Sequence, residues 1–385
     1  MNASWMSWPN AWGNGGIKMK KAAVLGTGLI GGSLALCLKE RTDMEVHGYD
    51  SSAESVRLAE ASGVVHRGHT ELEPAVEGAD VIFLAVPVGS APGLLEWLAG
   101  LPLKPSCIVS DVGSTKGKIV EHAGRLSRLG ATFIGGHPMA GSHRSGVQAA
   151  SSLLFENAYY VLTPIPATPL SEVQKLSRLL EKATRARLVI MDPAHHDRVV
   201  GAISHLPHIL AAALVNQVAD YNASNEWFHR LAAGGFRDLT RVAASDPVMW
   251  RDILLSNREA VLDLLEDWTE GMRRIREAVH NSDAGRIEGF FRRAKEAREG
   301  LPERRKPGMI PPAHEIYVDV PDIPGEIAGV AHLLGEEGIN LRNIGVMENR
   351  EDRAGVLRLV LNTEEEREKA EKRLKAGGYQ VFTSE

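Results

Sequence analysis

The stretch VLGTGLIGGS, from Val24 to Ser33, constrains the fold of this 385-residue chain more than any other. An apolar run breaks into Gly-x-Gly-x-x-Gly and resumes as an apolar helical pattern, so we expect a strand, a tight turn and a helix in succession. Gly26 permits the sharp turn, Gly28 lets the backbone approach a pyrophosphate, and Gly31 lets helix and strand pack closely. The sequence therefore predicts a phosphate-binding loop in a dinucleotide-binding fold.

The cofactor expected in this loop is NAD. The N–H groups of the first helical turn, at Leu29 and Ile30, favour phosphate binding together with the positive end of the helix dipole. Asp50 ends the next strand, VHGYD, where a carboxylate accepts hydrogen bonds from the ribose hydroxyls and repels the 2′-phosphate of NADP. The AVPVG segment ends a further strand and is expected to place Val86 and Pro87 beside the cofactor.

Hydrophobic periodicity divides the chain into parts with different secondary structure. Short apolar strands alternate with helical patterns as far as residue 190, which predicts an α/β Rossmann-type domain with a parallel sheet and crossover helices. Only helical periodicity follows, and beyond a segment rich in Pro, Gly and charge the order βαββαβ predicts a ferredoxin-like unit. The expected parts are a loose leader over 1–18, the NAD-binding domain over 19–190, an all-helical domain over 191–299, a linker over 300–313 and the C-terminal unit over 314–385.

Composition excludes several classes of protein. The net charge of −5 offers no basic face for nucleic acid, and no apolar run is expected to reach the length of a membrane span. The two cysteines, Cys37 and Cys107, lie inside apolar patterns, so neither a disulfide framework nor a zinc site is indicated. Because no Lys or Arg precedes Lys18, the first residues do not resemble a signal peptide, and a cytoplasmic location is expected.

Two loops gather residues suited to dehydrogenase chemistry, which needs an acid or base near the hydride and an anchor for an anionic substrate. DVGSTKGK follows a strand and carries Ser114. GGHPMAGSHRSG places His137 in a glycine-rich loop just past a strand, where ligand-facing groups lie in open α/β sheets. A neutral imidazole there can accept a proton at pH 7, although position alone also allows a surface loop histidine.

Further candidates lie in the helical part. SHLPH carries Ser204, His205 and His208 in a run of Ala, Val, Ile and Leu. Its two histidines share one helix face, which suits either a ligand-facing pair or half-buried structural histidines. Arg241, in GGFRDLTRVAASDP, is a candidate anchor for an anion. The cluster at residues 195–197, His-His-Asp, matches no standard zinc spacing, so no metal site is predicted.

Together these motifs resemble those of the prephenate dehydrogenase family. The GTGLIGGS turn, DVGSTKG, GGHPMAGS, SHLPH and FRDLTRVA occur in that family's order over residues 21–310. The HPMAGSHRSG form is similar to the subgroup that carries a C-terminal ACT domain, and PDIPGEIAGV with GINLRNI is similar to that domain. ACT modules generally bind small ligands, often amino acids, and regulate biosynthetic enzymes.

The resemblance implies an NAD-dependent oxidative decarboxylation of prephenate to 4-hydroxyphenylpyruvate in tyrosine biosynthesis. It makes His137 the catalytic histidine that accepts the hydrogen bond of the substrate hydroxyl, and Ser114 the serine that orients both near the nicotinamide. It makes Arg241 the arginine that binds a substrate carboxylate. Ser204 and His208 match positions in the substrate pocket, with His205 as a weaker candidate.

The resemblance also implies partners and regulation. The helical domain of the family builds a homodimer. Tyrosine, ahead of phenylalanine, is the expected ligand and inhibitor at the ACT domain, and competition by tyrosine at the active site is the alternative. One position departs from the family: His143 stands where some members place a glutamate six residues after the catalytic histidine, so a role for that glutamate is not carried over. With Arg144, His143 makes the pocket mouth more cationic, which suits a dianionic substrate.

Three alternatives stand beside this function. An arogenate or dual-specificity cyclohexadienyl dehydrogenase would accept an amino in place of a keto side chain, and no residue here separates the two. A β-hydroxyacid dehydrogenase would use a lysine of the helical domain, yet no lysine occurs between Ala183 and Ala294. A non-enzymatic sensor of NAD and an amino acid would have a decayed site, whereas Ser114, His137 and Arg241 are all present.

Overall fold

The computed structural model describes residues 19–124, 126, 130–141, 144–300, 314–321, 323–341, 343–347 and 355–382 of the chain. The chain divides into two compact units, residues 1–307 and 308–385. The expected leader, nearly all of the expected linker, and His143 lie outside the described residues.

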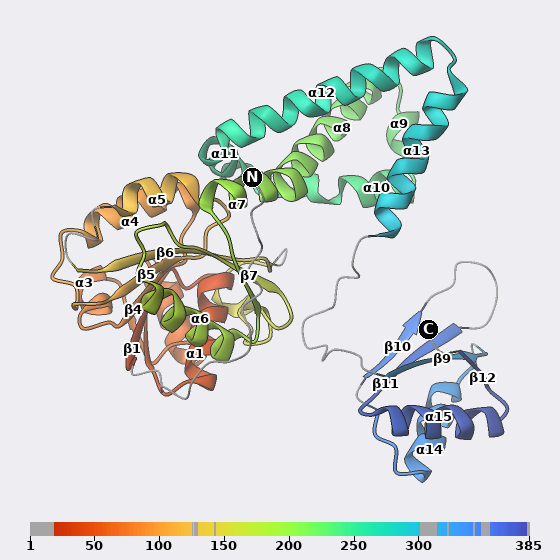
Figure 1. Ribbon diagram of the computed structural model, residues 1–385, viewed down its shortest axis with the longest axis horizontal. Helices are drawn as coiled ribbons and strands as arrows, with labels where there is room; N and C mark the ends of the chain where they lie inside the picture. The colour runs from red at the N-terminus through yellow and green to blue at the C-terminus, as the bar shows by residue number, and fades with distance from the viewer. Residues whose placement is uncertain are drawn as a thin grey trace. The chain divides into compact units, whose positions relative to one another are not determined.

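The first unit is built on one eight-stranded sheet with the order β3-β2-β1-β4-β5-β6-β7-β8 (Figure 1). Strands β1 to β6 are parallel, and their order is the one that dinucleotide-binding folds adopt, which confirms the predicted Rossmann-type α/β fold. The strands are β1 (Lys21–Leu25), β2 (Glu45–Tyr49), β3 (Arg67–His69), β4 (Val81–Leu84), β5 (Ile108–Asp111), β6 (Thr132–Pro138), β7 (Tyr159–Thr163) and β8 (Arg187–Ile190).

The far end of the sheet differs from the sequence expectation. β7 runs antiparallel to β6, so the prediction of a wholly parallel sheet is wrong there. The described residues between these strands form only the short 3-10 helix η3 (Val147–Ala149), whereas a parallel return needs a full crossover connection, usually a helix. The sequence also does not predict the edge strands β3 and β8. β3 is Arg-Gly-His, with no apolar residue, and β8 has no fully buried residue, whereas β4 and β5 are buried throughout.

Helices cover both faces of the sheet (Figure 1). On one face α1 and α6 bury Leu34 and Leu176 in one apolar core, and on the other α4 and α5 bury Leu95 and Ile119 in a second. The strand between them, VIFL of β4, is buried throughout, as is typical of a parallel sheet covered on both sides. The helices are α1 (Leu29–Arg41), α2 (Ala53–Ala61), α3 (Leu72–Val76), η1 (Val88–Ser90), α4 (Ala91–Leu98), α5 (Gly117–Ala123) and α6 (Leu170–Thr184).

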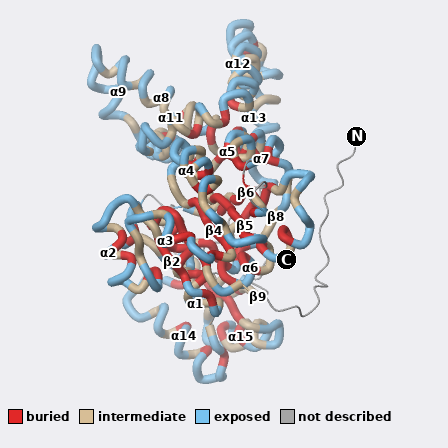
Figure 2. The backbone as a smooth tube through the Cα atoms, turned by 90° about the vertical axis from the view of Figure 1, so that its left-hand side faces the viewer, coloured by how far each residue is buried: buried red, intermediate tan, exposed pale blue. Residues whose placement is uncertain are grey.

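From residue 193 to 299 the chain forms only helices and turns, as the periodicity predicts. The helix α7 passes directly into the π-helical turn η4 and then into α8. Figure 2 shows α8, α9 and α12 far more exposed than the buried strands β4 and β5. The elements are α7 (Pro193–Val200), η4 (Gly201–His205), α8 (Leu206–Asn222), α9 (Trp227–Arg230), α10 (Gly234–Thr240), η5 (Arg241–Ala244), α11 (Pro247–Ser256), α12 (Arg258–His280) and α13 (Ala284–Glu299).

The continuous helical stretch Pro193–Asn222 is long and apolar enough, by length and composition, to cross a membrane. The expectation that no apolar run reaches that length is therefore wrong. Only 22% of its apolar window is buried within this chain, and exposed side chains on it include Ile203. The same stretch carries His205 and His208 and packs against η5 and α12, so its apolar surface suits contact with another protein surface.

The second unit has the predicted order βαββαβ and a four-stranded antiparallel sheet, β10-β11-β9-β12. Ile316 and Val318 of β9 alternate with half-buried neighbours and pack with Leu374 of α15, so this unit has an apolar core of its own. The ferredoxin-like prediction is confirmed. Its elements are β9 (His314–Val320), α14 (Glu326–Glu336), β10 (Asn343–Met347), β11 (Gly355–Leu361), α15 (Glu364–Ala376) and β12 (Gln380–Phe382).

Candidate active site

The glycine loop follows β1, and two of its glycines are required by contacts within the protein. Gly26 has φ +101°, and a Cβ there would lie 2.3 Å from the carbonyl oxygen of Ala85. A Cβ on Gly31 would lie 1.9 Å from the carbonyl oxygen of Gly26. No side chain fits at either position, because β1, α1 and the end of β4 meet at backbone distance.

Gly28, unlike Gly26 and Gly31, is not required by contacts within the protein. Its φ of −69° suits any residue, and a Cβ there would meet no atom within 4 Å. The first helical hydrogen bond of α1 runs from Gly32 N–H to Gly28 C=O at 2.8 Å, so the N–H groups of Leu29 and Ile30 have no acceptor within the helix. Open space beside free N–H groups fits a dinucleotide pyrophosphate, which needs close approach to the backbone.

Asp50, at the end of β2, is bonded to the glycine loop. Its Oδ2 accepts from the N–H of Thr27 at 2.9 Å and from the Thr27 hydroxyl at 3.0 Å, and its Oδ1 accepts from Ser52 N–H at 3.0 Å. The carboxylate thus stands at the mouth of the loop, where it can also accept from ribose hydroxyls. Val86 and Pro87 follow β4, and the Val86 side chain lies 3.2 Å from the Cβ position of Gly26.

A buried ion pair, Lys116 with Asp111, links the end of β5 to β6. Nζ of Lys116 contacts the Asp111 carboxylate and donates to the carbonyl oxygen of Gly136 at 2.6 Å. Oδ1 of Asp111 accepts from Gly136 N–H at 3.1 Å. Both side chains are buried, and burial lowers the pKa of Lys116 while the Asp111 charge raises it. The pair fixes the backbone that immediately precedes His137.

His137 lies near the carboxyl end of β6, so it shares one edge of the parallel sheet with the ends of β1, β4 and β5. Its Nδ1 lies 2.8 Å from Nε2 of His196, whose own Nδ1 lies 2.8 Å from Oδ1 of Asp197. Burial, together with the charges of Lys116 and the neighbouring histidines, holds the pKa of His137 well below its usual value. His137 is therefore neutral at pH 7, in the state that accepts a proton.

The π turn η4 and the start of α8 carry the SHLPH residues. His208 donates from Nδ1 to the carbonyl oxygen of Ser204 at 2.8 Å, and its ring stacks on Trp250 with the centroids 3.8 Å apart. His205 is buried, its Nδ1 lies 3.0 Å from Nδ2 of Asn257, and burial lowers its pKa to about 4. His205 thus packs inside the helical layer, and the half-buried His208 is better placed for a ligand.

The other predicted site residues, Ser114 and Arg241, are placed by the elements that carry them. Ser114 is half-buried in the loop between β5 and α5, at the same sheet edge as His137. Arg241 is exposed on η5, which packs along α8, so α8 connects it to the histidines. Sequence reasoning missed a role for Lys116, and it weighed His196 and Asp197 only as metal ligands. In DVGSTKGK, Lys116 is preceded by Asp111 and flanked by small residues, and this pattern is the sequence signal of their buried ion pair.

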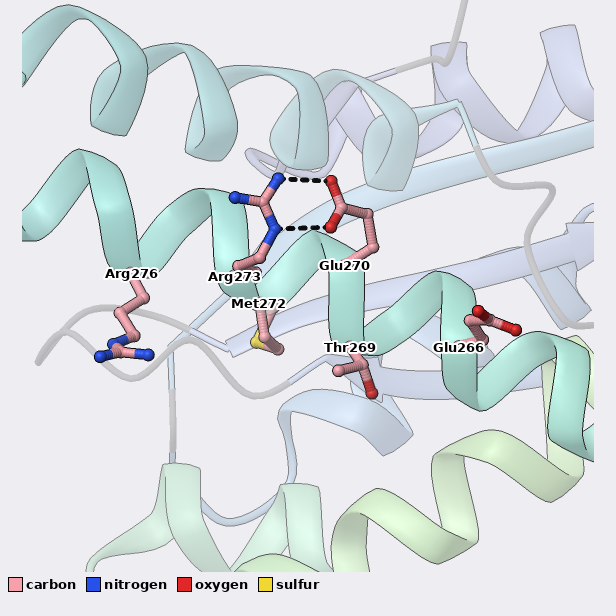
Figure 3. Close-up of a pocket in the computed structure, with 6 residues that line it drawn as sticks. All are labelled: Glu266, Thr269, Glu270, Met272, Arg273 and Arg276. Carbon is pink, nitrogen blue, oxygen red and sulfur yellow. Dashed lines mark hydrogen bonds and ion pairs between the residues drawn. The ribbon is translucent and has the colours of Figure 1, made fainter.

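Two cavities lie on or against the helical layer. One of about 500 Å³ is lined by residues of α12 alone, with Arg273 donating to Glu270 at 2.7 Å and lowering the pKa of Glu270 to about 2 (Figure 3). Since a single helix lines it, this cavity is an open surface of α12. Another of about 210 Å³ lies where η1, α5 and α11 meet, between the cofactor loop after β4 and the helix that carries Trp250. Its lining includes Val88, Lys118 and Asp252.

Two family models match most of the first unit. Residues 34–190 match the nucleotide-binding domain of prephenate dehydrogenase, and residues 192–294 match its dimerization domain. The chain is 42% identical over 368 residues to the prephenate dehydrogenase of Bacillus subtilis (strain 168), which covers 95% of this chain and 99% of that protein. It is 41% identical over 355 residues to the prephenate dehydrogenase of Lactococcus lactis subsp. cremoris (strain MG1363), covering 91% of this chain and 96% of that protein.

A solved structure is similar over the first unit. The crystal structure of prephenate dehydrogenase from A. aeolicus, in complex with hydroxyphenyl propionate and NAD+, matches with a TM-score of 0.69 and 32% sequence identity. The match covers 73% of this chain and 98% of that one.

Proposed function

The chain belongs to the prephenate dehydrogenase family, and on that premise we propose which residues carry the reaction and how it is regulated. The activity is the NAD-dependent oxidative decarboxylation of prephenate to 4-hydroxyphenylpyruvate, a step of tyrosine biosynthesis. The observation that carries the residue assignment is the neutral, hydrogen-bonded His137 at the sheet edge where the glycine loop also lies.

His137 is the general base. Its Nε2 accepts the proton of the ring hydroxyl, so that a carbonyl forms at that carbon as the hydride leaves. The glycine loop at Gly26, Gly28 and Gly31 would hold NAD+, which would supply the hydride acceptor. The bond to the ring carboxylate breaks with release of CO2, and its electron pair enters the ring. The ring becomes aromatic, and its oxygen takes the proton back from His137, which gives the hydroxyl of the product and restores the neutral base. The low pKa of His137 keeps it ready to accept a proton throughout the neutral range.

Other residues bind and orient the substrate. Ser114, at the end of β5, is assigned to hold the hydroxyl beside His137, and Arg241 to bind a substrate carboxylate by a charge-assisted hydrogen bond. Ser204 and His208 are assigned to the helical side of the substrate site. The ring of His208 stacks on Trp250, whose Nε1–H is buried and has no hydrogen-bond partner among the described residues. A buried N–H donor of this kind favours an oxygen-rich ligand.

The test is a continuous absorbance assay for NADH. Purified protein is mixed with NAD+ and prephenate and, separately, with NAD+ and arogenate. Turnover on prephenate supports the proposal, and the ratio of the two rates determines how far the enzyme discriminates keto from amino side chains. Binding of NAD without turnover on either substrate would favour the sensor alternative instead.

We assign the dimer interface to the helical layer. The stretch Pro193–Asn222 leaves most of its apolar surface uncovered within one chain, and exposed side chains such as Leu231 and Leu239 lie in the segments that follow it. The family model that matches this layer describes a dimerization domain. Light scattering at several concentrations should give the mass of two chains, and the protein should fractionate with the cytoplasm rather than with membranes.

Tyrosine is the proposed inhibitor, acting through an ACT-like C-terminal unit. That unit has its own apolar core and its own sheet, which suits a separate ligand-binding module. The chain shortened after residue 300 should keep turnover and lose its sensitivity to tyrosine. Unchanged sensitivity would place tyrosine at the active site, as a competitor of the similar product.

A further inference from the structure

A chain of hydrogen bonds ends on the proposed base. His196, on α7, lies between His137 and Asp197, with a contact of 2.8 Å on each side of its ring. His196 is fully buried and Asp197 is 6% exposed, so bulk water does not compete for these contacts. Neither residue is assigned to the reaction above.

The chemistry of the three groups decides where the protons lie. An ionised carboxylate only accepts hydrogen bonds, so Nδ1 of His196 carries a proton toward Asp197. Nε2 of a neutral His196 is then bare, and it accepts the hydrogen bond that Nδ1–H of His137 donates. A neutral His137 with its proton on Nδ1 has a bare Nε2, which is the atom that must accept the substrate proton.

Asp197 is held from several sides. Its Oδ1 accepts from the N–H of Lys116 at 2.8 Å, and its Oδ2 accepts from the N–H of Gly117 at 2.7 Å, both at the start of α5. Its backbone carbonyl accepts from Nδ2 of Asn257 at 2.8 Å. With a donor on each carboxylate oxygen, Asp197 keeps one orientation toward His196.

We propose that His196 and Asp197 are positioning residues that hold His137 in the tautomer with a bare Nε2 and share the positive charge it acquires during turnover. The inference rests on the proposed function, in which His137 is the base. The substrate proton moves to Nε2 of His137, and the Nδ1 proton remains in the hydrogen bond to His196. The resulting imidazolium is stabilised through His196 by the negative charge of Asp197.

The other charged groups around His137 explain why the Asp197 carboxylate matters for a positive charge on His137. Burial, Lys116 and the two neighbouring histidines, His196 and His205, all disfavour a positive charge on His137. Asp111, the nearby carboxylate on β5, is already engaged by the Lys116 ammonium group. Asp197 is therefore the carboxylate available to offset a charge on His137 through a direct chain of hydrogen bonds.

The experiment compares steady-state kinetics with prephenate and NAD+ in full-length variants. His196→Leu removes the acceptor for His137 Nδ1–H, and His196→Gln offers a side-chain oxygen in its place. His195→Gln is the control, because His195 is exposed at the preceding position of the same helix. We expect His196→Leu to lower kcat by about 10²-fold. His196→Gln should recover much of that loss, and His195→Gln should match wild type. NADH affinity, measured by fluorescence, should be unchanged in all three.

The tautomer is measured directly in the wild-type protein, so the inference does not depend on a variant that folds. In protein labelled with ¹⁵N-histidine, the His137 signals are identified by their loss in His137→Asn, and they should show a protonated Nδ1 and a bare Nε2. The opposite tautomer would overturn the inference. So would a His196→Leu enzyme with wild-type kcat, or equal losses in the Leu and Gln variants. Failure of the proposed function is separate: it would appear as no turnover by wild type, or as full turnover by His137→Asn.

Discussion

The glycine loop gives a prediction in which two similar substitutions should have opposite consequences. In Gly28→Ala the new methyl group meets no protein atom within 4 Å, and the backbone at φ −69° suits alanine. Alanine restricts the unfolded chain, which stabilises the fold by about 0.4–1 kcal/mol, and it is a poorer N-cap than glycine by a similar amount, so the net change in stability is about zero. The methyl group does enter the space assigned to the pyrophosphate. Loss of one charge-assisted hydrogen bond, worth about 1.5–3 kcal/mol, should weaken NAD binding about 10- to 150-fold.

Gly31→Ala is the matched comparison. Its methyl group would lie 1.9 Å from the Gly26 carbonyl oxygen and 2.7 Å from the Ala85 methyl group, so α1 must move away from β1. Overpacking of this kind costs about 1–3 kcal/mol, which lowers the melting temperature by several degrees. Thermal melting without cofactor, followed by titration with NADH, separates the two effects. Wild-type binding of NADH by Gly28→Ala would contradict the placement of the pyrophosphate beside Gly28. A melting temperature as low as that of Gly31→Ala would contradict the open space at that position.

Four further outcomes follow from the site. His137→Asn should lower kcat about 10²- to 10⁴-fold with cofactor affinity unchanged, as measured by NADH formation and NADH fluorescence, and wild-type turnover would remove His137 from the mechanism. Arg241→Gln should raise KM for prephenate about 10- to 100-fold with a smaller effect on kcat; an unchanged KM would contradict its assignment. Asp50→Ala should reduce the preference for NAD+ over NADP+ when both are assayed; an unchanged preference would show that another residue discriminates. Because the pKa of His137 lies well below 6.5, kcat/KM for prephenate should stay level from pH 8 to below pH 6.5 and fall only at more acidic pH, where the base is protonated; a fall centred at pH 6.5 or above would contradict the burial argument.

The sequence was most informative where local patterns decide the structure. The turn at Gly26 needs a positive φ, and the strand–turn–helix pattern around it predicts both the loop and the fold. Strand alternation in EIYVDV likewise predicts β9 and the C-terminal unit. The edge strands β3 and β8 were not predicted because they lack the fully buried apolar run of β4 and β5. The antiparallel direction of β7 was not predicted because strand direction depends on the path of the connection.

The candidate site was predictable to the extent that its residues stand in unusual places. The glycine-rich stretch around His137 and the histidine pair in an apolar helix are visible without a structure. The expectation that His137 lies in a loop past the strand is wrong, because β6 continues through it to Pro138. The partners of His137 are not visible in the sequence, because His196 is 59 residues away in the chain and adjacent letters do not show which of His195, His196 and Asp197 point inward. The π turn η4, one residue wider per turn than an α-helix, also shifts the face on which Ser204 and His205 lie.

The contacts of Asp197 show how the chain continues across residue 191, where the sequence predicts a boundary between the NAD-binding domain and the helical domain. Strand patterns end there and helical patterns begin, yet residues up to 307 form one compact unit. Asp197, on the helical side, accepts from the N–H groups of Lys116 and Gly117 in the cofactor-binding part, and it also bonds His196. One carboxylate thus joins α7 to the start of α5 and also contacts His196, the partner of the proposed base His137. Since hydride transfer and proton transfer must occur in one geometry, a joint that moved independently of His137 would separate the base from the cofactor. The hydrogen bonds of Asp197 join the helix that carries His196 to the cofactor-binding part, which suits a site where proton transfer and hydride transfer take place together.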